Sequence, residues 1–589
     1  MVFKKMIKST SSKSLIIKTN LIFLSFFLLL YIILLLCPSV SDYQETATLL
    51  VRCSLHDCHH KKENGIKMKA VVEENKSGLK SLREMIKRKK PSFLKGIIGK
   101  GTKIGMVNMD DEDISDWTSE DGRIFPVSFE PVSDMLEWKH IYPEWIDEEE
   151  EYSGSSCPDI PMPDFDEYDE RMDVIMAKLP CRFPEEGWNR DVFRLQVHLV
   201  AAKMAAMRGR WDWNGRMKVV FVSECRPMVE IFRCDEMVER EGDWWYYNVE
   251  KGRLEQKIGM SLGSCSLALP LWDKKGVNQI YDVTKIEAAT QNPRRRRREA
   301  YATVLHSSES YVCGAITLAQ SLLRTGTRRD LLLLLDTSIS EPKRIALAQA
   351  GWTLRFIERI RSPKAEKGSY NEYNYSKFRL WQLTGYDKII FIDADVVVLR
   401  NLDILFHFPQ MSATGNDGSI FNSGIMVIEP SNCTFNMLMQ RRDEIVSYNG
   451  GDQGYLNEVF VWWHRLPRRV NFLKNFWSNS SIEAGVKNQL FVSDPPKLYS
   501  IHYLGLKPWN CYRDYDCNWN VEDQHVYASD EAHTRWWKVH DAMDDELQRL
   551  CRLPKRRKIE LEWDRKIARE KGFKDQHWRI NATDPRKYF

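Results

Sequence analysis

The sequence predicts an α/β fold with a mainly parallel sheet in its C-terminal half, preceded by an accessory region, a stem and a membrane anchor. Three observations support this prediction. Short apolar strands alternate with helices from about residue 297 onward, clusters of like charge fill an irregular stretch before residue 157, and a long apolar run lies near the N-terminus. Strands of a parallel sheet are covered on both faces, so they are nearly continuous apolar runs.

The composition is that of a globular protein. Of 589 residues, 43% are hydrophobic and 29% are charged, which excludes a wholly disordered, a collagen-like or a polytopic membrane protein. The 86 Lys and Arg against 82 Asp and Glu give a net charge of +4, which argues against a dedicated nucleic-acid binder. Thirteen cysteines are too few for a disulfide scaffold and leave at least one thiol unpaired, although Cys511 and Cys517 are close enough in sequence to bridge.

The N-terminal apolar run covers residues 21–37 and is interrupted only by Ser25. Five lysines precede it, and no acidic residue occurs before Asp42. A helix that crosses a bilayer needs about 20 apolar residues, and flanking lysines keep the preceding end in the cytosol. We therefore expect a cytosolic tail at 1–20, a type II signal-anchor at 21–40 and a lumenal remainder. The alternative is a cleaved signal peptide with its cleavage site at residues 39–41.

The rest of the chain divides by its local composition. Residues 41–157 contain blocks of like charge, which repel one another, so we expect a lumenal stem. Residues 158–290 form an accessory region with a helix expected at 192–207 and a strand at 217–222. Residues 297–575 form the C-terminal domain, and 576–589 form a tail. Five triplets predict N-linked glycosylation on the lumenal side, at Asn75, Asn374, Asn432, Asn479 and Asn581.

In the C-terminal domain, strands are expected at 300–305, 331–335, 353–357 and 388–392, and helices at 312–323, 343–350 and 376–383. Ligands of such sheets bind at the carboxyl ends of the strands. Asp393 and Asp395 follow the strand at 388–392 directly, and residues i and i+2 of a strand point the same way. The two carboxylates are suited to a hard divalent cation that bridges phosphates, or else they are capping or solvated groups.

Three further segments carry polar groups near glycines. Residues 421–424 open an apolar strand, residues 450–454 place Asp452 and Gln453 on a flexible turn before a helix, and residues 502–507 contain His502 and Lys507. An imidazole ligand favours Mn²⁺ over Mg²⁺.

Together with residues 375–381, these segments occur in one order between about residues 301 and 573. The sequence here resembles glycosyltransferase family 8, which includes glycogenin and the galactinol synthases. The resemblance implies a nucleotide-sugar-binding fold of the GT-A type. It also implies that Asp393, Asp395 and His502 coordinate Mn²⁺, with Mg²⁺ as the alternative, and that Lys507 contacts the donor diphosphate.

The resemblance further implies a catalytic role for Asp452, Gln453 and Lys377, and sugar transfer with retention of configuration. Either a carboxylate such as Asp452 attacks the anomeric carbon, or the leaving group and the acceptor meet on one face of the sugar. The implied donor-binding residues are Val304, His306, Tyr311, Arg379, Asp393, Ala394, Asp395, Asn422, Ser423, Gly424, Asp452, Gln453, His502, Gly505 and Lys507.

The upstream stretch at 219–227 and the aromatic residues at 244–247 resemble the plant xylan α-glucuronosyltransferases. The resemblance implies a Golgi membrane enzyme that transfers glucuronic acid from UDP-glucuronate to O2 of xylose in xylan, within cell-wall synthesis. The alternatives are another UDP-sugar or wall polysaccharide, or an inactive scaffold of a wall-synthesis complex. Four tryptophans either lie at the surface and stack on xylan, or pack in the core or at its rim. They are Trp462, Trp463, Trp509 and Trp519.

Overall fold

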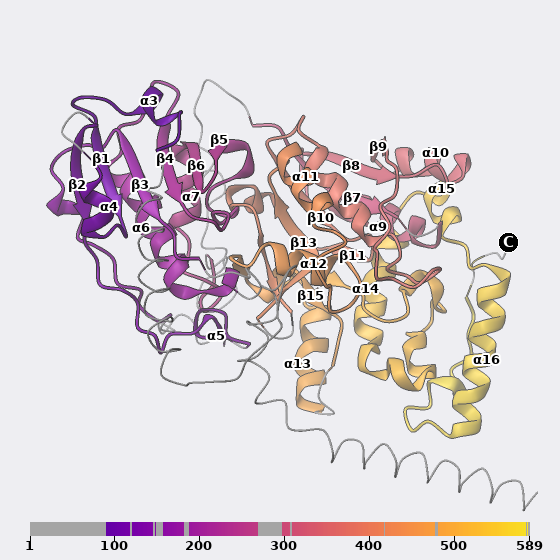
Figure 1. Ribbon diagram of the computed structural model, residues 1–589. Coiled ribbons are helices and arrows are strands. Elements are labelled where there is room, and N and C mark those ends of the chain that lie inside the picture. The colour runs from indigo at the N-terminus through magenta and orange to yellow at the C-terminus, as the bar shows by residue number, and fades with distance from the viewer. Residues whose placement is uncertain are drawn as a thin grey trace, which may run out of the picture. The chain divides into compact units, whose positions relative to one another are not determined.

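A computed structural model of the chain describes residues 90–117, 121–144, 146, 148, 157–181, 188–268, 297–306, 309–416, 419–476, 481–584 and 586 (Figure 1). The predicted tail and signal-anchor at 1–40, and the stem up to residue 89, lie outside these residues. No helix among the described residues is both long and apolar enough to cross a bilayer.

The first part of the described chain forms a six-stranded sheet with the order β2-β1-β3-β4-β6-β5. The strands β2, β1, β3 and β4 are parallel, whereas β6 is antiparallel to both β4 and β5. The elements are α3 (Leu94–Ile97), β1 (Lys103–Val107), α4 (Asp111–Ser115), β2 (Arg123–Val127), α5 (Trp138–Ile141), β3 (Val174–Lys178), α6 (Val192–Arg208), β4 (Arg216–Val222), β5 (Met237–Glu241), β6 (Trp244–Glu250) and α7 (Lys251–Ile258).

The prediction of a stem through residue 157 is wrong where the chain forms this sheet. Strand β1 is flanked by β2 and β3, and its residues Ile104, Met106 and Val107 are buried. The acidic cluster after it does not mark a solvated linker. Asp110 instead caps the short helix α4 by accepting a hydrogen bond from the Asp113 amide. Five-residue strands between charged segments are too short to produce a clear periodic signal.

The predicted helix at 192–207 and strand at 217–222 are confirmed as α6 and β4. The Asp191 side chain caps α6 by accepting a hydrogen bond from the Arg194 amide. Most of α6 is buried, and it packs against β3 and α7. The accessory region therefore has its own α/β core.

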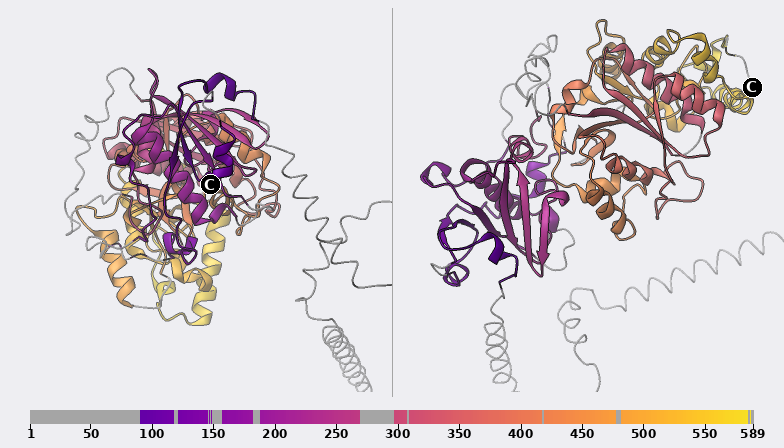
Figure 2. Two further views of the ribbon diagram at one scale, coloured as in Figure 1. Left: turned by 60° about the vertical axis from the view of Figure 1, so that its left-hand side comes forward. Right: turned by 90° about the horizontal axis from the view of Figure 1, so that it is seen from above.

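The second sheet in the described chain has seven strands in the order β14-β12-β13-β10-β7-β8-β9. The four strands β10, β7, β8 and β9 are parallel, whereas β13 runs antiparallel to β10 and β12. Its strands are β7 (Glu299–Leu305), β8 (Asp330–Leu335), β9 (Thr353–Phe356), β10 (Lys388–Ile392), β12 (Ser412–Gly415), β13 (Phe421–Ile428) and β14 (His464–Leu466). The two sheets come from separate stretches of the chain, as the colours of Figure 2 show.

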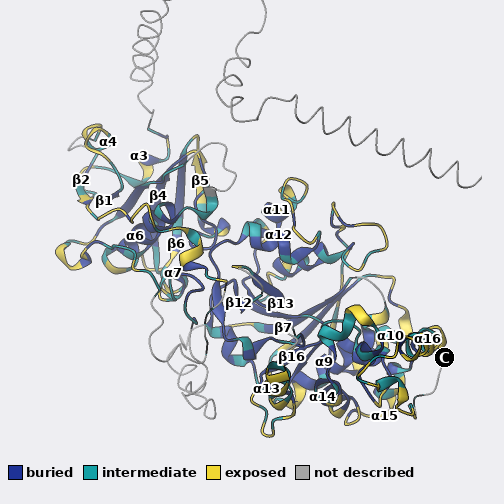
Figure 3. Ribbon diagram, turned by 90° about the horizontal axis from the view of Figure 1, so that it is seen from below, coloured by how far each residue is buried: buried dark blue, intermediate teal, exposed yellow. Residues whose placement is uncertain are grey.

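A smaller sheet, β11-β16-β15, consists of Val396–Val398, Ser500–His502 and Phe472–Leu473. The helices of this half are α9 (Val312–Arg324), α10 (Glu341–Gln349), α11 (Asn432–Gln440), α12 (Asp452–Val459), α13 (Ser481–Val492), α14 (Asp530–His540), α15 (Asp545–Gln548) and α16 (Lys555–Lys571). Strands β10 and β13 are buried throughout, whereas α16 buries only Leu561 and Ala568 (Figure 3). The ends of β10 and β13 are therefore held by a fully buried part of the sheet.

The strands and helices predicted for this half agree with the structure to within one or two residues, with one exception. The predicted α-helix at 376–383 is instead a 3₁₀ segment, Asn374–Gln382. Most of its side chains are buried, including both Tyr375 and Lys377, so tertiary contacts rather than helix propensity determine its geometry.

All ten cysteines in the described residues are paired, as Cys157–Cys265, Cys181–Cys225, Cys234–Cys433, Cys313–Cys551 and Cys511–Cys517. The Cys234–Cys433 bond joins the accessory region to the C-terminal domain. Beside it, Arg233 forms an ion pair with Glu429 at 3.2 Å. One apolar cluster also contains core residues of both sheets, such as Val219 and Phe391. The two halves thus share covalent, ionic and apolar contacts.

Replacing Cys234 and Cys433 by serine should lower the free energy of unfolding by about 5 kcal/mol, because the bond closes a loop of 199 residues. Removing Cys511–Cys517, which are six residues apart, should cost only about 2 kcal/mol. Denaturant unfolding of both serine variants under oxidising conditions measures the difference. Equal losses would contradict the loop-closure account.

Candidate active site

The two predicted carboxylates lie at the carboxyl end of β10. The strand ends at Ile392, and the Asp393 amide then donates a hydrogen bond of 2.8 Å to the carbonyl of Gly424 on the neighbouring strand β13. Strand β11 begins directly after Asp395. Because β10 lies between β7 and β13, the apolar core fixes the backbone from which both carboxylates project.

His502 joins them from β16. Strand β16 is antiparallel to β11, and the register places His502 opposite Val396, next to Asp395. The imidazole Nε2 lies 3.3 Å from Asp395 Oδ1. One possible ligand atom from each of Asp393, Asp395 and His502 lies within 4.8 Å of the others. The structure therefore brings together the three residues predicted to bind a metal.

This donor set fits a divalent cation. Within the described residues, the buried His502 Nδ1 has no hydrogen-bond partner, and Gly424 leaves room for the ring, because a Cβ there would lie only 2.5 Å from His502 Cε1. The other ring nitrogen faces a carboxylate oxygen. Two carboxylates and an imidazole in one place are ligands that Mn²⁺ accepts. The arrangement is compatible with a bound divalent cation.

Two lysines, of which Lys377 is fully buried, lie next to the carboxylates. Lys377 Nζ is 3.1 Å from Asp393 Oδ1 and 2.8 Å from Asp452 Oδ2. Lys507 Nζ is 2.7 Å from Asp395 Oδ2. The amine of Lys377 thus links Asp393, which follows β10, to Asp452, which is buried at the N-terminus of α12.

The pKa values reflect this arrangement. Burial raises the pKa of Asp393 to about 6, although Lys377 opposes the rise. Burial also acts to raise the pKa of Asp395, but Lys507 and His502 outweigh it and keep that pKa below its ordinary value. Burial disfavours the charged form of Lys377, yet Asp393 and Asp452 raise its pKa above the ordinary value. The site therefore holds at least one ionised carboxylate and two ammonium groups.

A cavity of about 230 Å³ opens beside these groups. Of the predicted site residues, it is lined by Val304, His306, Tyr311, Lys377, Asp393, Ala394, Asp395 and Lys507. Burial and Lys377 lower the pKa of His306 to about 4, so its ring is neutral at physiological pH. Burial raises the pKa of Tyr311 to about 12.

Sequence analysis missed four residues of this lining, which are Leu305, Tyr370, Asn374 and Leu504. Leu305 and Leu504 adjoin predicted residues, so sequence adjacency was an available signal. Tyr370 and Asn374 precede the 375–381 segment and carried no signal of their own.

Other predicted donor-binding residues support the site from outside the cavity. Asn422 Oδ1 accepts hydrogen bonds from the Gly424 amide and from Asn471 Nδ2. Gln453 Oε1 accepts one from the Ser423 amide at 3.1 Å. These contacts join β13 to the start of α12, so the polar side chains of the 421–424 segment stabilise the local backbone.

Two predicted donor-binding residues, Arg379 and Gly505, do not line the cavity. Arg379 does not line the cavity, because its guanidinium donates to the Glu358 carbonyl and to Gln382 Oε1. Gly505 packs against Asn518 instead of lining the cavity, and a Cβ on Gly505 would lie 2.5 Å from Asn518 Oδ1. Sequence pattern alone cannot show which way a side chain points from an irregular segment.

The predicted glycosylation sites differ in their exposure to solvent. Asn432 and Asn581 are exposed, whereas Asn75 and Asn479 lie outside the described residues. Asn374 lines the cavity, and the hydroxyl-bearing Ser376 of its triplet is buried. A glycan on Asn374 would fill the cavity, so the structure argues against that site.

Of the two alternatives for the four tryptophans, internal packing holds for three of them. Trp462, Trp463 and Trp509 have exposures of only 1–3% and contribute to the core. Trp519 is half-buried and stacks on His577.

Comparison with known proteins gives two family matches. Residues 79–265 match the GUX1-5 N-terminal domain, and residues 302–512 match glycosyl transferase family 8. UDP-glucuronate:xylan alpha-glucuronosyltransferase 2 of Arabidopsis thaliana is 60% identical, over 100% of this chain and 98% of its own. The chain belongs to the xylan alpha-glucuronosyltransferase family.

This transferase has further relatives. UDP-glucuronate:xylan alpha-glucuronosyltransferase 1 of Arabidopsis thaliana is 49% identical, over 83% of this chain and 72% of its own. Glycogenin-1 of Caenorhabditis elegans is 32% identical, over 36% of this chain and 51% of its own. Among solved structures, the galactosyltransferase LgtC in complex with donor and acceptor sugar analogues is 18% identical, with a TM-score of 0.30 over 43% of this chain and 99% of that chain.

Family membership and the mixed, mostly parallel sheet together identify a GT-A-like glycosyltransferase fold. The match at 79–265 also agrees with the observation that β1 and β2 belong to a sheet rather than to a stem.

Replacing Asp395 by Asn and His502 by Ala in one variant should abolish Mn²⁺ binding and sugar transfer, because two of the three ligands are lost. Titration calorimetry with Mn²⁺ measures the binding. Asp111→Asn is a matched control, because Asp111 is an exposed acid of another Asp-x-Asp triplet, on α4. Undiminished Mn²⁺ binding by the folded double variant would refute the assignment of the metal ligands.

Proposed function

We propose that this transferase moves glucuronic acid from UDP-glucuronate to O2 of xylose residues in xylan, with retention of configuration and with Mn²⁺ as cofactor. The observation that carries the proposal is the cluster of Asp393, Asp395 and His502 beside Lys377 and Lys507. Relatives named for this donor and acceptor align with nearly the whole chain and support the choice of substrates.

The charges in the cavity suit a nucleotide sugar. A divalent cation held by Asp393, Asp395 and His502 would supply positive charge for the donor diphosphate. Lys507 lines the same cavity and its ammonium can stabilise the negative charge that develops on the departing diphosphate. Val304, His306 and Tyr311 form a less polar wall, where the uracil and ribose would lie.

The placement of Asp452 bears on the retaining mechanism. Its carboxylate pairs with Lys377 at 2.8 Å, and this ion pair stabilises the carboxylate and so reduces its nucleophilicity. We therefore favour the mechanism in which the leaving group and the acceptor hydroxyl meet on one face of the sugar. In that mechanism Asp452 and Gln453 orient the transferred sugar.

We also propose that the protein is a type II Golgi membrane protein with its catalytic domain in the lumen. The five disulfides of the described residues are suited to an oxidising compartment. The apolar run at 21–37, with its preceding lysines, provides a candidate anchor. A role within a wall-synthesis complex is compatible with this location. An inactive scaffold is disfavoured, because every residue of the predicted metal site is present and assembled.

The purified protein should transfer sugar to xylohexaose from UDP-glucuronate at least about tenfold faster than from UDP-glucose, UDP-galactose or UDP-xylose. A tenfold preference requires only about 1.4 kcal/mol of differential binding. Mass spectrometry of the product measures transfer, and NMR of its anomeric proton identifies the linkage. Transfer from a neutral UDP-sugar without transfer from UDP-glucuronate would refute the donor, and a β-linked product would refute retention.

A further inference from the structure

The metal ligand His502 and the diphosphate-binding candidate Lys507 lie on one short loop. His502 ends β16, and Lys507 follows five residues later. Both side chains converge on Asp395, with His502 Nε2 at 3.3 Å and Lys507 Nζ at 2.7 Å. Lys507 also donates to the Tyr503 carbonyl at 2.6 Å. The positions of both groups therefore depend on the path of residues 502–507.

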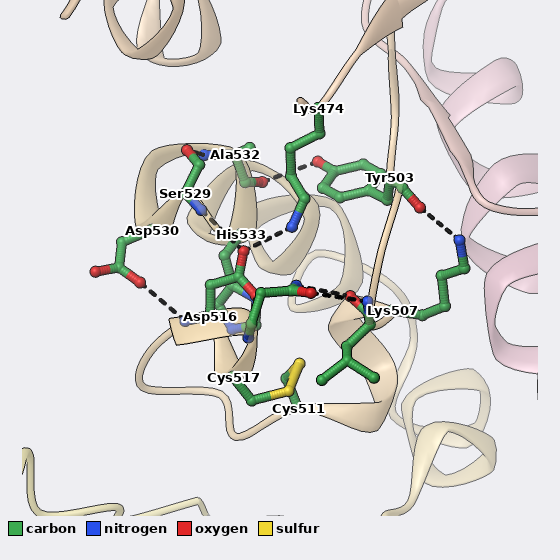
Figure 4. Close-up of polar contacts among 12 residues, drawn as sticks. Lys474, Tyr503, Lys507, Cys511, Asp516, Cys517, Ser529, Asp530, Ala532 and His533 are labelled. Atoms are coloured by element: carbon green, nitrogen blue, oxygen red, sulfur yellow. Dashed lines mark hydrogen bonds and ion pairs between the residues drawn. A yellow bond between two sulfur atoms is a disulfide. The ribbon is translucent and has the colours of Figure 1, made fainter. Parts of the chain in front are cut away.

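A buried ion pair lies behind this loop. Lys474 Nζ is 2.6 Å from Asp516 Oδ2, and the two side chains are 0% and 1% exposed (Figure 4). Asp516 Oδ2 also accepts a hydrogen bond from the Ser529 amide at 3.0 Å. Such a pair is weak evidence for stability, because removing two charges from water costs about as much as their attraction returns. We therefore look for its role in the segments that it holds in place.

This ion pair is linked to the loop at two places. The Lys474 amide donates to the His502 carbonyl at 2.9 Å. Asn518 holds the main chain of Leu506 from both sides, accepting from the Leu506 amide at 2.9 Å and donating to the Leu506 carbonyl at 3.1 Å. Asp516 Oδ1 in turn orients the side-chain amide of Asn518, because it accepts a hydrogen bond of 2.6 Å from Asn518 Nδ2.

The contact between Asn518 and the loop is close. Gly505 adopts a φ of +74°, which other residues rarely adopt, and a Cβ there would lie 2.5 Å from Asn518 Oδ1. Residue 505 can therefore pack on the Asn518 amide only as glycine. The loop is thus held by a side-chain network rather than by sheet pairing.

We propose that Lys474, Asp516 and Asn518 are positioning residues that hold His502 and Lys507 in place for the cation and the donor diphosphate. The proposal rests on the proposed metal and UDP site. None of the three lines the cavity, so they act through the loop at 502–507. Loss of the two hydrogen bonds between Asn518 and Leu506 frees Leu506 and Gly505 to move, and Lys507 moves with them.

Asn518→Ala and Asp516→Asn test this proposal. Titration calorimetry with Mn²⁺ and with UDP in the presence of Mn²⁺ should show affinities reduced by about 10- to 100-fold for both variants, as for other groups that orient metal ligands. If Asp516→Asn does not fold, Asn518→Ala decides alone, because it leaves both buried charges paired. Lys474→Met is expected to weaken binding in the same direction.

Glu429→Gln is the matched control. Glu429 pairs with Lys388 at 3.5 Å, both side chains are 5–7% exposed, and Lys388 lies at the opposite end of β10 from Asp393. This variant should lower the melting temperature while preserving Mn²⁺ and UDP affinity. Reduced stability of Asn518→Ala with unchanged affinities would overturn the positioning role. Failure of the wild-type protein to bind Mn²⁺ and UDP would instead refute the proposed function.

A separate observation concerns the rim of the cavity. Tyr370 lines the cavity and is 74% exposed, and Tyr448 is 61% exposed. Tyr448 Oη accepts a hydrogen bond of 2.6 Å from Gln453 Nε2, beside Asp452. The two loops that carry these tyrosines meet where Asn371 Nδ2 donates to the Asn449 carbonyl at 2.9 Å. Two exposed aromatic rings therefore flank the groups expected to face the transferred sugar.

We further infer that Tyr370 and Tyr448 form a stacking surface for the pyranose rings of a polysaccharide acceptor. This inference also rests on the proposed function. Tyrosine suits the role because it presents an apolar ring face with a polar edge. Both rings border the reacting groups, whereas the buried Trp462, Trp463 and Trp509 cannot meet a soluble polymer.

Tyr370→Ala and Tyr448→Ala should each raise the KM for xylohexaose by about three- to tenfold. Tyr448→Phe, which keeps the ring and loses the hydroxyl, should retain the acceptor KM. Trp213→Ala is a control, because Trp213 is 92% exposed but lies in the accessory region. An unchanged acceptor KM in both alanine variants would overturn the inference. Absence of transfer to xylohexaose by the wild-type protein would refute the proposed acceptor.

Discussion

The repulsion between two neighbouring carboxylates, Asp393 and Asp395, is the constraint around which the site is arranged. Like charges in a low-dielectric interior cannot both ionise without compensation. Lys377 and Lys507 compensate them from opposite sides, and His502 completes the cluster. A cation and a diphosphate could join this site without leaving large uncompensated charge.

The sheet explains why these groups meet. Strand β10 is fully buried between β7 and β13, so its end is fixed, and β11 pairs with β16 immediately beyond it. Lys474, which precedes β16, and Asn518, which follows it, hold the loop that carries His502 and Lys507. The buried pair of Lys474 and Asp516 shows that this support includes charged groups far from solvent. The rigid sheet and the network behind the loop thus hold opposite sides of one site.

The apolar strands and the residues that follow them were predictable from sequence, because periodicity and strand ends are local properties. The convergence of Asp393 with His502, more than 100 residues apart in the chain, followed only from family resemblance. Local patterns could not show that Arg379 turns away from the cavity, that Trp462 is buried, or that Asn518 holds Leu506. These facts depend on tertiary contacts. The strand β1 was missed because a five-residue strand between charged segments gives little periodic signal.

The most direct test of the central claim is anomalous diffraction from crystals of the protein grown with Mn²⁺ and UDP. The account predicts one strong manganese peak coordinated by Asp393, Asp395 and His502, with the diphosphate next to Lys507. A manganese ion bound elsewhere, with Asp393 and Asp395 contacting only Lys377 and Lys507, would contradict it.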